Sequence, residues 1–221
     1  EIYTLSLHDA LPICQVLMIA AGELQKALIR VSELIIEAEP VLTEIDSIIG
    51  DGDHGTGMKR GFSAVYDLLN IKSFTAVPDL FYMTGMELLK KMGGASGVLF
   101  GSFFISGAKV QFQNEKEITL SEMSLVFRSG TDSIMKRGKA QSGDKTMIDA
   151  LIPASRAFQE AVVQGCSRRE CFERAYKASL QGAQATVEMI PKRGRAKNFR
   201  LDAIGYPDPG AISVKIGRAH V

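Results

Sequence analysis

The sequence predicts an all-α fold, a single-domain bundle of about eight antiparallel helices. Apolar residues recur at helical spacing along nearly the whole chain, and no run alternates polar and apolar residues as a strand does. Segments rich in glycine and proline separate these periodic stretches, as expected of loops between helices. No internal repeat or low-complexity linker divides the 221 residues, so we assign one domain, residues 15–214.

Three helices are expected in the first half of the chain, at residues 15–38, 54–71 and about 78–92. Pro40 ends the first apolar pattern, because proline cannot continue a helix interior. The second helix follows a glycine-rich loop. Pro78 and Asp79 suit the start of the third, where a missing amide costs nothing and a carboxylate is favoured.

Five further helices are expected, at about residues 98–112, 121–137, 145–164, 168–189 and 208–214. The string GGASG at 93–97 interrupts the pattern before the first of these. Ser121 and Glu122 resemble an N-terminal cap, and Gly138 ends that helix. Gly97, Gly101 and the neighbouring serine are small enough for close helix packing or close approach of a ligand.

Composition narrows the class of protein. A formal net charge of +1 with 46% hydrophobic residues favours a sizeable core and argues against a surface dedicated to direct nucleic-acid binding. Three cysteines at no metal-ligand spacing indicate reduced thiols in a cytoplasmic protein. The longest uncharged run, 92–108, falls short of the ~20 residues of a membrane span, and we interpret it as a buried helix without membrane contact.

The two ends of the chain differ from the rest. The opening EIYTLSLHDALPIC has no basic region of the kind that begins a secretory signal. It resembles translated adaptor sequence, as does the closing KIGRAHV. We therefore expect residues 1–14 and 215–221 to be non-native ends outside the domain.

The segment DSIIGDGDHGTG, residues 46–57, concentrates three aspartates and a histidine among four glycines. Carboxylates brought together repel one another unless a cation or a donor compensates. Oxygen ligands alone suit Mg²⁺ or Ca²⁺, and Mg²⁺ commonly adds substrate phosphates. The HGTG string begins a helix, where free amides can hold phosphate. The segment therefore indicates a site for metal and phosphate.

The segment does not fit two other loop motifs. A loop that follows the EF-hand pattern from Asp51 would need glycine and glutamate where Thr56 and Phe62 stand, and no GxxxxGK[ST] string occurs. A glycine-rich turn capped by Asp53, with the other aspartates at the surface, stays an alternative because these are ordinary turn residues.

Three more loops carry small or charged residues, at 93–97, 138–146 and 193–210. In an antiparallel bundle, the loops after the first, third, fifth and seventh helices lie at one end. These loops and the aspartate segment are those four. We therefore expect one site at that end, with Arg195 or Lys145 available to phosphate.

Four separated motifs carry a resemblance to a known family. DSIIGDGDHG, KKMGGASGVLFGSFF, RGKAQSGDKTMIDALIPA, and KRGRA followed by IGYPDPGAISV together resemble the L subunits of dihydroxyacetone kinases. The resemblance covers about residues 15–214 in order. It implies a barrel of eight antiparallel helices with ADP or ATP and two Mg²⁺ at one end.

The resemblance also implies roles at matching positions. The magnesium ligands would be Asp46, Asp51 and Asp53. The nucleotide contacts would be His54, Gly55, Thr56, Gly57, Ala95, Ser96, Gly138, Met147, Arg195, Asp208, Pro209 and Gly210. Two positions depart from the family pattern: Gly57 stands where asparagine is frequent, and Tyr206-Pro207 replaces His-Gln. The first departure bears on one polar nucleotide contact, and the second would change either the rim of the pocket or the substrate subunit that it faces.

The function that the resemblance implies is phosphoryl transfer without a covalent enzyme nucleophile. A phosphohistidine of a phosphotransferase-system partner would phosphorylate bound ADP, which would pass the group to dihydroxyacetone on a separate K subunit. His54 as a phosphocarrier is the less favoured assignment. The alternatives are the nucleotide domain of an ATP-dependent triose or tetrose kinase, a module that reports nucleotide state to a transcription regulator, and a helical bundle with accidental acidic turns.

Overall fold

The fold is described for residues 18–216 of a computed structural model. We predicted that residues 1–14 and 215–221 are non-native ends, and of these residues 1–14 and 217–221 lie outside the described range. Lys215 and Ile216 lie inside it, in the last helix, and Ile216 packs against the core. The suggestion that the ends are non-native stays a prediction.

The described part of the chain is helical, as predicted, apart from two three-residue strands and short 3₁₀ turns. Its α-helices are α2 (Ala21–Glu37), α3 (Glu39–Ile49), α4 (His54–Ile71), α5 (Val77–Lys91), α6 (Gly94–Gly107), α7 (Leu120–Gly138), α8 (Ile148–Val163), α9 (Arg168–Ala185) and α10 (Pro209–Ile216). The strands are β1 (Met18–Ala20) and β2 (Glu117–Thr119), and the 3₁₀ turns are η1 (Thr186–Glu188), η2 (Ala196–Asn198) and η3 (Arg200–Ala203).

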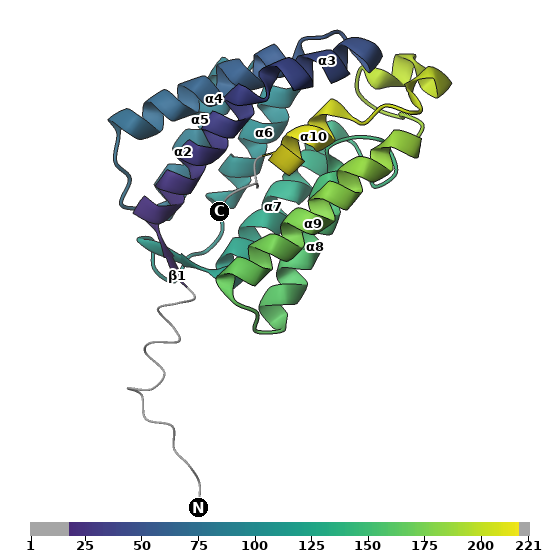
Figure 1. Ribbon diagram of the computed structural model, residues 1–221. Coiled ribbons are helices and arrows are strands. Elements are labelled where there is room, and N and C mark those ends of the chain that lie inside the picture. Colours follow the sequence, from purple (N-terminus) through teal and green to yellow (C-terminus); the bar gives the residue numbers. More distant parts are fainter. Residues whose placement is uncertain (1–17, 217–221) are drawn as a thin grey trace, which may run out of the picture.

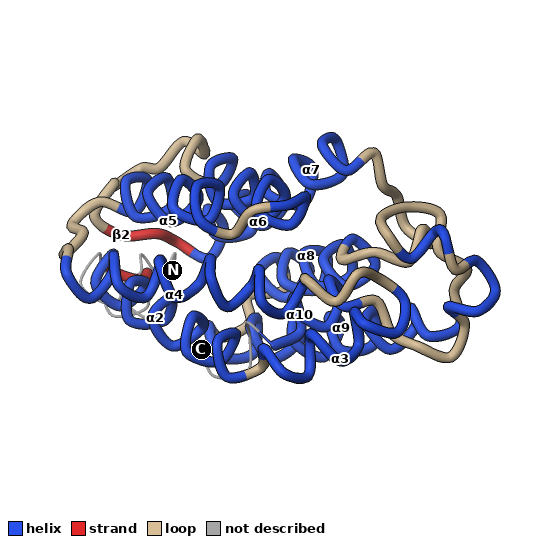
Figure 2. The backbone as a smooth tube through the Cα atoms, turned by 90° about the horizontal axis from the view of Figure 1, so that it is seen from above, coloured by secondary structure: helices blue, strands red, loops and turns tan. Residues whose placement is uncertain are grey.

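Eight of the helices form a closed ring. Each of α2, α4, α5, α6, α7, α8 and α9 packs on the next, and α10 closes the ring by packing on α9 and α2 (Figures 1 and 2). The apolar faces point inward and bury one continuous core, which includes Leu42, Val65, Leu88 and Phe158. The ring is the barrel of about eight helices that the sequence led us to expect.

Small residues set the closest packing in this ring. A Cβ on Gly85 of α5 would lie 2.7 Å from the Gly101 carbonyl oxygen, and a Cβ on Gly101 of α6 would lie 2.9 Å from that of Gly85. The two backbones therefore touch, which a larger residue at either position would prevent. The expected close packing of Gly101 is explained by this contact.

The end of the barrel away from the four loops is tied by the strand pair. β1 and β2 are antiparallel, with Met18 opposite Thr119 (Figure 1). Thr119 also caps α7: its hydroxyl accepts the Glu122 amide at 3.1 Å, and the Glu122 carboxylate accepts the Thr119 amide at 2.8 Å. The cap residue is thus Thr119 and not Ser121 as predicted, because Thr119 completes a reciprocal pair with Glu122.

Two predicted boundaries were wrong for a physical reason. The first helix begins at Ala21 because the preceding residues pair as β1, and a separate helix, α3, was missed. Pro40 was taken as a stop, yet it occupies the first turn of α3, where no amide partner is needed. Likewise α6 begins at Gly94 instead of residue 98. Of the two glycines with positive φ, Gly93 is the N-cap and Gly94 is the first helical residue, so neither interrupts the helix.

The uncharged run 92–108 corresponds to α6, which is buried on one side and partly exposed on the other. Within residues 18–216, every helix is too short or too polar to cross a membrane.

Candidate functional site

The predicted acidic cluster forms where α3 meets α4. Asp46 is buried in the last turn of α3, and Asp51 and Asp53 follow on the connecting loop. One oxygen from each of the three carboxylates lies within 4.8 Å of the others. Gly52 adopts a φ of +74°, and a Cβ on Gly50 would overlap the Asp46 carboxylate. The glycines therefore allow the loop to fold back over Asp46.

The electrostatics of this cluster favour a bound cation. Burial, the charge of Asp51 beside it and the charge of Asp46 raise the pKa of Asp53, which Arg195 partly offsets. Asp53 makes no side-chain cap to α4, so its carboxylate faces the cluster instead. The Nε of Arg195 contacts an oxygen of Asp51 at 2.8 Å. Three convergent carboxylates are a donor set that suits Mg²⁺.

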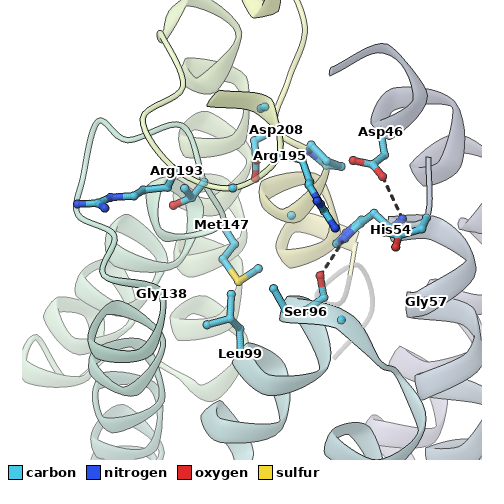
Figure 3. Close-up of a pocket in the computed structure, with 18 of the residues that line it drawn as sticks. Asp46, His54, Gly57, Ser96, Leu99, Gly138, Met147, Arg193, Arg195 and Asp208 are labelled. Carbon is cyan, nitrogen blue, oxygen red and sulfur yellow. Dashed lines mark hydrogen bonds between the residues drawn. The ribbon is translucent and has the colours of Figure 1, made fainter. Parts of the chain in front are cut away.

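His54 opens α4 and links three elements. Its amide donates to the Asp46 carboxylate at 3.0 Å, and its Nδ1 lies 3.2 Å from the Ser96 hydroxyl (Figure 3). Its Nε2 lies 2.8 Å from the Ser213 hydroxyl of α10. Burial lowers the pKa of the His54 imidazole, against the opposing influence of Asp46. The ring is therefore a buried part of the wall, with a hydroxyl group against each of its nitrogens.

The turn from α5 to α6 supplies the adjacent wall. Gly93 and Gly94 have φ values of +74° and +59°. Arg60 of α4 fixes this turn by donating from Nε to the Lys91 carbonyl at 2.9 Å and from Nη2 to the Met92 carbonyl at 2.7 Å. The turn directs the first residues of α6 toward the cavity, where the amides of a helix start can bind an anion.

The loop before α8 is fastened to the segment after α9 by two neighbouring charges. The buried Asp144 carboxylate lies 3.7 Å from the Lys192 ammonium and 3.6 Å from the Arg193 Nε. The buried Lys145 ammonium donates to the carbonyls of Thr186 at 2.6 Å and Tyr206 at 2.7 Å.

Lys145 thus links the loop before α8 to the segment after α9. Burial lowers the pKa of its ammonium, and the charges of Asp208 and Glu188 oppose that shift. Of the two cations expected beside phosphate, Arg195 or Lys145, Arg195 lies at the acidic cluster, whereas Lys145 lines the cavity but directs its ammonium at backbone carbonyls.

Asp208 starts α10 at the back of the site. Its carboxylate accepts the Ala211 amide at 2.8 Å, and its own amide donates to the Thr186 hydroxyl at 2.9 Å. Burial raises the pKa of Asp208 to about 7, with a contribution from the charge of Asp149, while Lys145 and the Ala211 amide act the other way. Asp208 is therefore poised between its neutral and charged forms near neutral pH.

The four loops enclose one cavity of about 430 Å³ at this end of the barrel (Figure 3). The structure brings most of the predicted site residues to its wall: Asp46, Asp51, Asp53, His54, Gly57, Ala95, Ser96, Gly138, Met147, Arg195, Asp208, Pro209 and Gly210. Gly55 and Thr56 lie outside this lining. Gly55 packs against Glu39 and Thr43 of α3, and the Thr56 hydroxyl donates to the Asp53 carbonyl at 3.0 Å.

Sequence reasoning missed part of the wall. An apolar side of the cavity is formed by Leu99, Ile134, Ala140 and Ile148 beside Met147, and Arg60 and Arg193 add positive charge. The apolar residues carried no signal of their own, because Leu99, Ile134 and Ile148 continue the core faces of their helices and Ala140 is a small loop residue. Arg193 stood in a predicted site loop, so the clustering of basic residues there was the available signal.

Fold and site together define the class of protein: an all-helical barrel with an acidic, metal-type cluster at one end of a cavity whose opposite side is apolar. Comparison with known proteins gives the family. The chain belongs to the DAK2 domain family, whose model matches residues 48–217.

Relatives of similar length sharpen this result. The chain is 39% identical over 187 residues to the ADP-binding subunit DhaL of a PEP-dependent dihydroxyacetone kinase from Escherichia coli, covering 85% of this chain and 89% of the relative. It is 40% identical over 184 residues to the corresponding subunit of dihydroxyacetone kinase 2 from Listeria innocua, covering 81% and 83%. The resemblance to dihydroxyacetone kinase L subunits is thereby confirmed.

Longer proteins share the same unit. The dihydroxyacetone kinase of C. freundii matches with a TM-score of 0.70 at 26% identity, over 87% of this chain and 32% of that protein. An L-erythrulose kinase from Pectobacterium atrosepticum is 32% identical over 88% of this chain and 33% of its own length. The chain therefore spans about a third of these two kinases.

Proposed function

We propose that this protein is the nucleotide-carrying subunit of a phosphoenolpyruvate-dependent dihydroxyacetone kinase. The observation that carries the proposal is a single cavity with three clustered carboxylates on one side and an apolar wall on the other. Such a cavity fits a molecule with a metal-bound phosphate end and a flat apolar end. Its relatives of nearly equal length are named ADP-binding subunits, which supports the same ligand.

Within this proposal, Asp46, Asp51 and Asp53 would hold two Mg²⁺, and the starts of α4 and α6 would provide amides for phosphate. The C. freundii kinase has been solved in complex with AMP-PNP and Mg²⁺, which supports the presence of the metal but not the number of ions. Arg195 adds positive charge beside Asp51. Met147 and Gly138 lie on the apolar side, where the base would bind.

The chemistry is phosphoryl transfer to and from bound ADP. When bound, Mg²⁺ neutralises charge that develops on the transferred phosphoryl group. The chain's own residues position the nucleotide and hold that charge in place, and no side-chain nucleophile is needed. His54 is not placed for a carrier role, because both of its ring nitrogens already meet hydroxyl groups and the ring is buried.

The partners follow from the chemistry. A phosphohistidine protein of the phosphotransferase system would donate the phosphoryl group, and a K subunit would present dihydroxyacetone. Both would approach the mouth of the cavity, where Arg193 and Arg195 lie. The reaction would take place in the cytoplasm. A transcription regulator that senses the nucleotide state is a further candidate partner.

A second candidate function rests on the longer relatives. An L-erythrulose kinase contains this unit over a third of its length, so the chain could instead act with a sugar site and free ATP. The two functions differ in nucleotide exchange. A carrier subunit retains ADP through many turnovers, whereas an ATP-dependent kinase exchanges labelled ATP within each turnover.

Native mass spectrometry of the purified protein in Mg²⁺ tests the proposal. We expect an added mass of one ADP and two Mg²⁺ that survives buffer exchange. Subsequent incubation with a phosphorylated donor protein should convert ADP to ATP without release. A protein that gains no mass even after addition of excess Mg²⁺ and ADP would contradict the proposal.

A further inference from the structure

Ser213 of α10 lies against two residues of the cavity wall, the imidazole of His54 and the carbonyl of Pro209. The residue is 2% exposed, and its hydroxyl makes two contacts: the His54 Nε2 at 2.8 Å and the Pro209 carbonyl at 3.0 Å. A carbonyl oxygen can only accept a hydrogen bond, and the Ser213 hydroxyl donates its single proton to that of Pro209. The Ser213 oxygen is then left as an acceptor toward His54.

This arrangement selects one form of the His54 ring. A neutral imidazole carries its proton on one nitrogen and accepts at the other. Because Ser213 can only accept, Nε2 must carry the proton. Nδ1 is then an acceptor, and the Ser96 hydroxyl at 3.2 Å must be its donor.

The tautomer of His54 determines how Ser96, a residue of the cavity wall, directs its hydroxyl proton. Ser96 has one hydroxyl proton, and it is directed at His54, so its oxygen meets the cavity with lone pairs. Phosphate oxygens also only accept. The Ser96 hydroxyl therefore suits a cation or a hydroxyl group, and the start of α6 binds phosphate through backbone amides.

We propose that Ser213 is a positioning residue that fixes the Nε2–H tautomer of His54 and thereby determines the hydrogen-bond direction of Ser96 in the nucleotide site. The tautomer assignment depends on the structure alone, and its consequence for Mg²⁺·ADP rests on the function proposed above. The coupling joins α10, α4 and α6, whose contributing residues lie far apart in the sequence.

The test is nitrogen NMR of the ¹⁵N-labelled full chain, recorded in Mg²⁺-free buffer above the ordinary histidine pKa of ~6.5. Long-range proton–nitrogen correlations identify which ring nitrogen is protonated, and a His54→Gln sample assigns the signals among the three histidines. We expect His54 in the wild type to be protonated at Nε2. Protonation at Nδ1 would overturn the proposal without any further variant.

Three variants test the role of the hydroxyl. Ser213→Ala should produce a measurable Nδ1–H population, and Ser213→Thr should restore the wild-type signals. Ser32→Ala is the matched control, because Ser32 is also fully buried and its hydroxyl also bonds a carbonyl four residues back, at 2.8 Å. Identical His54 signals in wild type and Ser213→Ala would overturn the proposal.

Calorimetric titration with ADP in Mg²⁺ gives the second measurement. Ser213→Ala should weaken binding about fivefold, the equivalent of one lost hydrogen bond, while Ser213→Thr and Ser32→Ala bind as the wild type does. If the wild type binds no ADP but shows the expected tautomer response, the proposed function fails and the positioning role of Ser213 stands. Equal ADP affinity in wild type and Ser213→Ala would contradict the effect on the site.

Discussion

At the scale of single residues, the acidic cluster brings together carboxylates that repel one another and that could bind a cation. Asp46, Asp51 and Asp53 bring three carboxylates within 4.8 Å of one another, and their mutual repulsion contributes to the raised pKa of Asp53. A fold does not gain stability from such an arrangement unless a cation completes it. The cluster is therefore the part of the site most directly open to test.

Asp51→Asn keeps the shape of the side chain and removes its charge. Loss of an outer-shell partner costs ~10–100-fold in metal affinity, so loss of a direct ligand should weaken Mg²⁺-dependent ADP binding at least about tenfold. The fold should persist, since Asp51 is exposed. Isothermal titration with and without Mg²⁺ measures the effect. Asp67→Asn, an exposed carboxylate on α4, is the control, and unchanged Mg²⁺ dependence in Asp51→Asn would refute the ligand assignment.

Lys145→Met tests the buried ammonium. It leaves the Thr186 and Tyr206 carbonyls without their donor, so we expect a loss of about 3 kcal/mol in the free energy of unfolding. Urea denaturation measures this, with the exposed Lys136→Met as a control expected to change stability by less than ~0.5 kcal/mol. Undiminished stability together with lost ADP binding would mean that Lys145 contacts the nucleotide after all.

At the scale of elements, the packing of α3 on α4 places Asp46 beside the loop. Gly55 is the closest point of this contact, since a Cβ there would overlap the Glu39 carbonyl and the Thr43 hydroxyl. Gly57 lies one residue beyond Thr56 in the same helix, where a Cβ would lie 3.6 Å from the Met92 carbonyl oxygen. Gly55 is therefore required by the close contact between α3 and α4, whereas the packing around Gly57 leaves room for a Cβ.

Alanine at each position should separate these reasons. We expect Gly55→Ala to cost about 1–3 kcal/mol and to weaken Mg²⁺ binding, because α3 must shift and carry Asp46 with it. Gly57→Ala should be neutral or stabilise the protein by about 0.5–1 kcal/mol, because it adds a helix-favouring residue where there is room. Thermal denaturation and Mg²⁺ titration of both variants measure this. Equal effects would show that the α3–α4 contact does not position Asp46.

The start of α10 gives a pH prediction. Asp208 has a pKa of about 7 in the folded protein against 3.8 as the ordinary value, so the folded state binds more protons between those values. The contribution of Asp208 to stability is therefore present below pH ~4 and is lost as the pH rises toward ~7.

Asp208→Asn should remove this contribution to the pH dependence. The amide oxygen can still accept the Ala211 amide, but the side chain cannot ionise. The variant should gain stability relative to the wild type as pH rises through that window, measured by urea denaturation in metal-free buffer. Asp202→Asn, exposed in η3, is the control. Parallel stability curves for wild type and Asp208→Asn would contradict the raised pKa.

The sequence predicted the helices more reliably than their ends. Each of the eight predicted stretches corresponds to a helix, α2 and α4 through α10, because glycine and proline mark their loops. The missed helix, α3, begins with a proline that the pattern could not distinguish from a stop. The convergence of four loops was predictable from their alternation between ends of a bundle. The pairing of Ser213 with His54 was not, since it depends on how α10 closes the ring.

At the scale of the whole molecule, the cavity wall comes from all four loops, so its ligand would bridge segments that the chain itself joins only through long helices. Ile49 of α3 also packs on Ala196 and Ala203 of the segment after α9, which closes one side of the mouth. Binding should therefore stabilise the entire barrel and not one loop.

Heating the protein with Mg²⁺ and ADP tests this. At ~100 times the dissociation constant, a ligand adds about 2.7 kcal/mol, and each kcal/mol raises Tm by about 2–4 °C in a domain of this size. We expect a single transition raised by about 5–10 °C, measured by scanning calorimetry. Mg²⁺ without nucleotide should shift it much less. A second, unshifted transition would show that part of the barrel unfolds independently of the site.

The residues of the cavity wall lie far apart in the sequence, so they leave the ribosome at different times during synthesis. Ribosomes extend a chain at ~5–20 residues per second, and amino-terminal parts emerge first. The three aspartates therefore emerge long before Arg195, Asp208 and Ser213, which belong to the last part of the chain. Mg²⁺ and ADP can engage the complete wall only after α10 has left the ribosome. In a cell, nucleotide retention would mark molecules in which α10 has closed the ring.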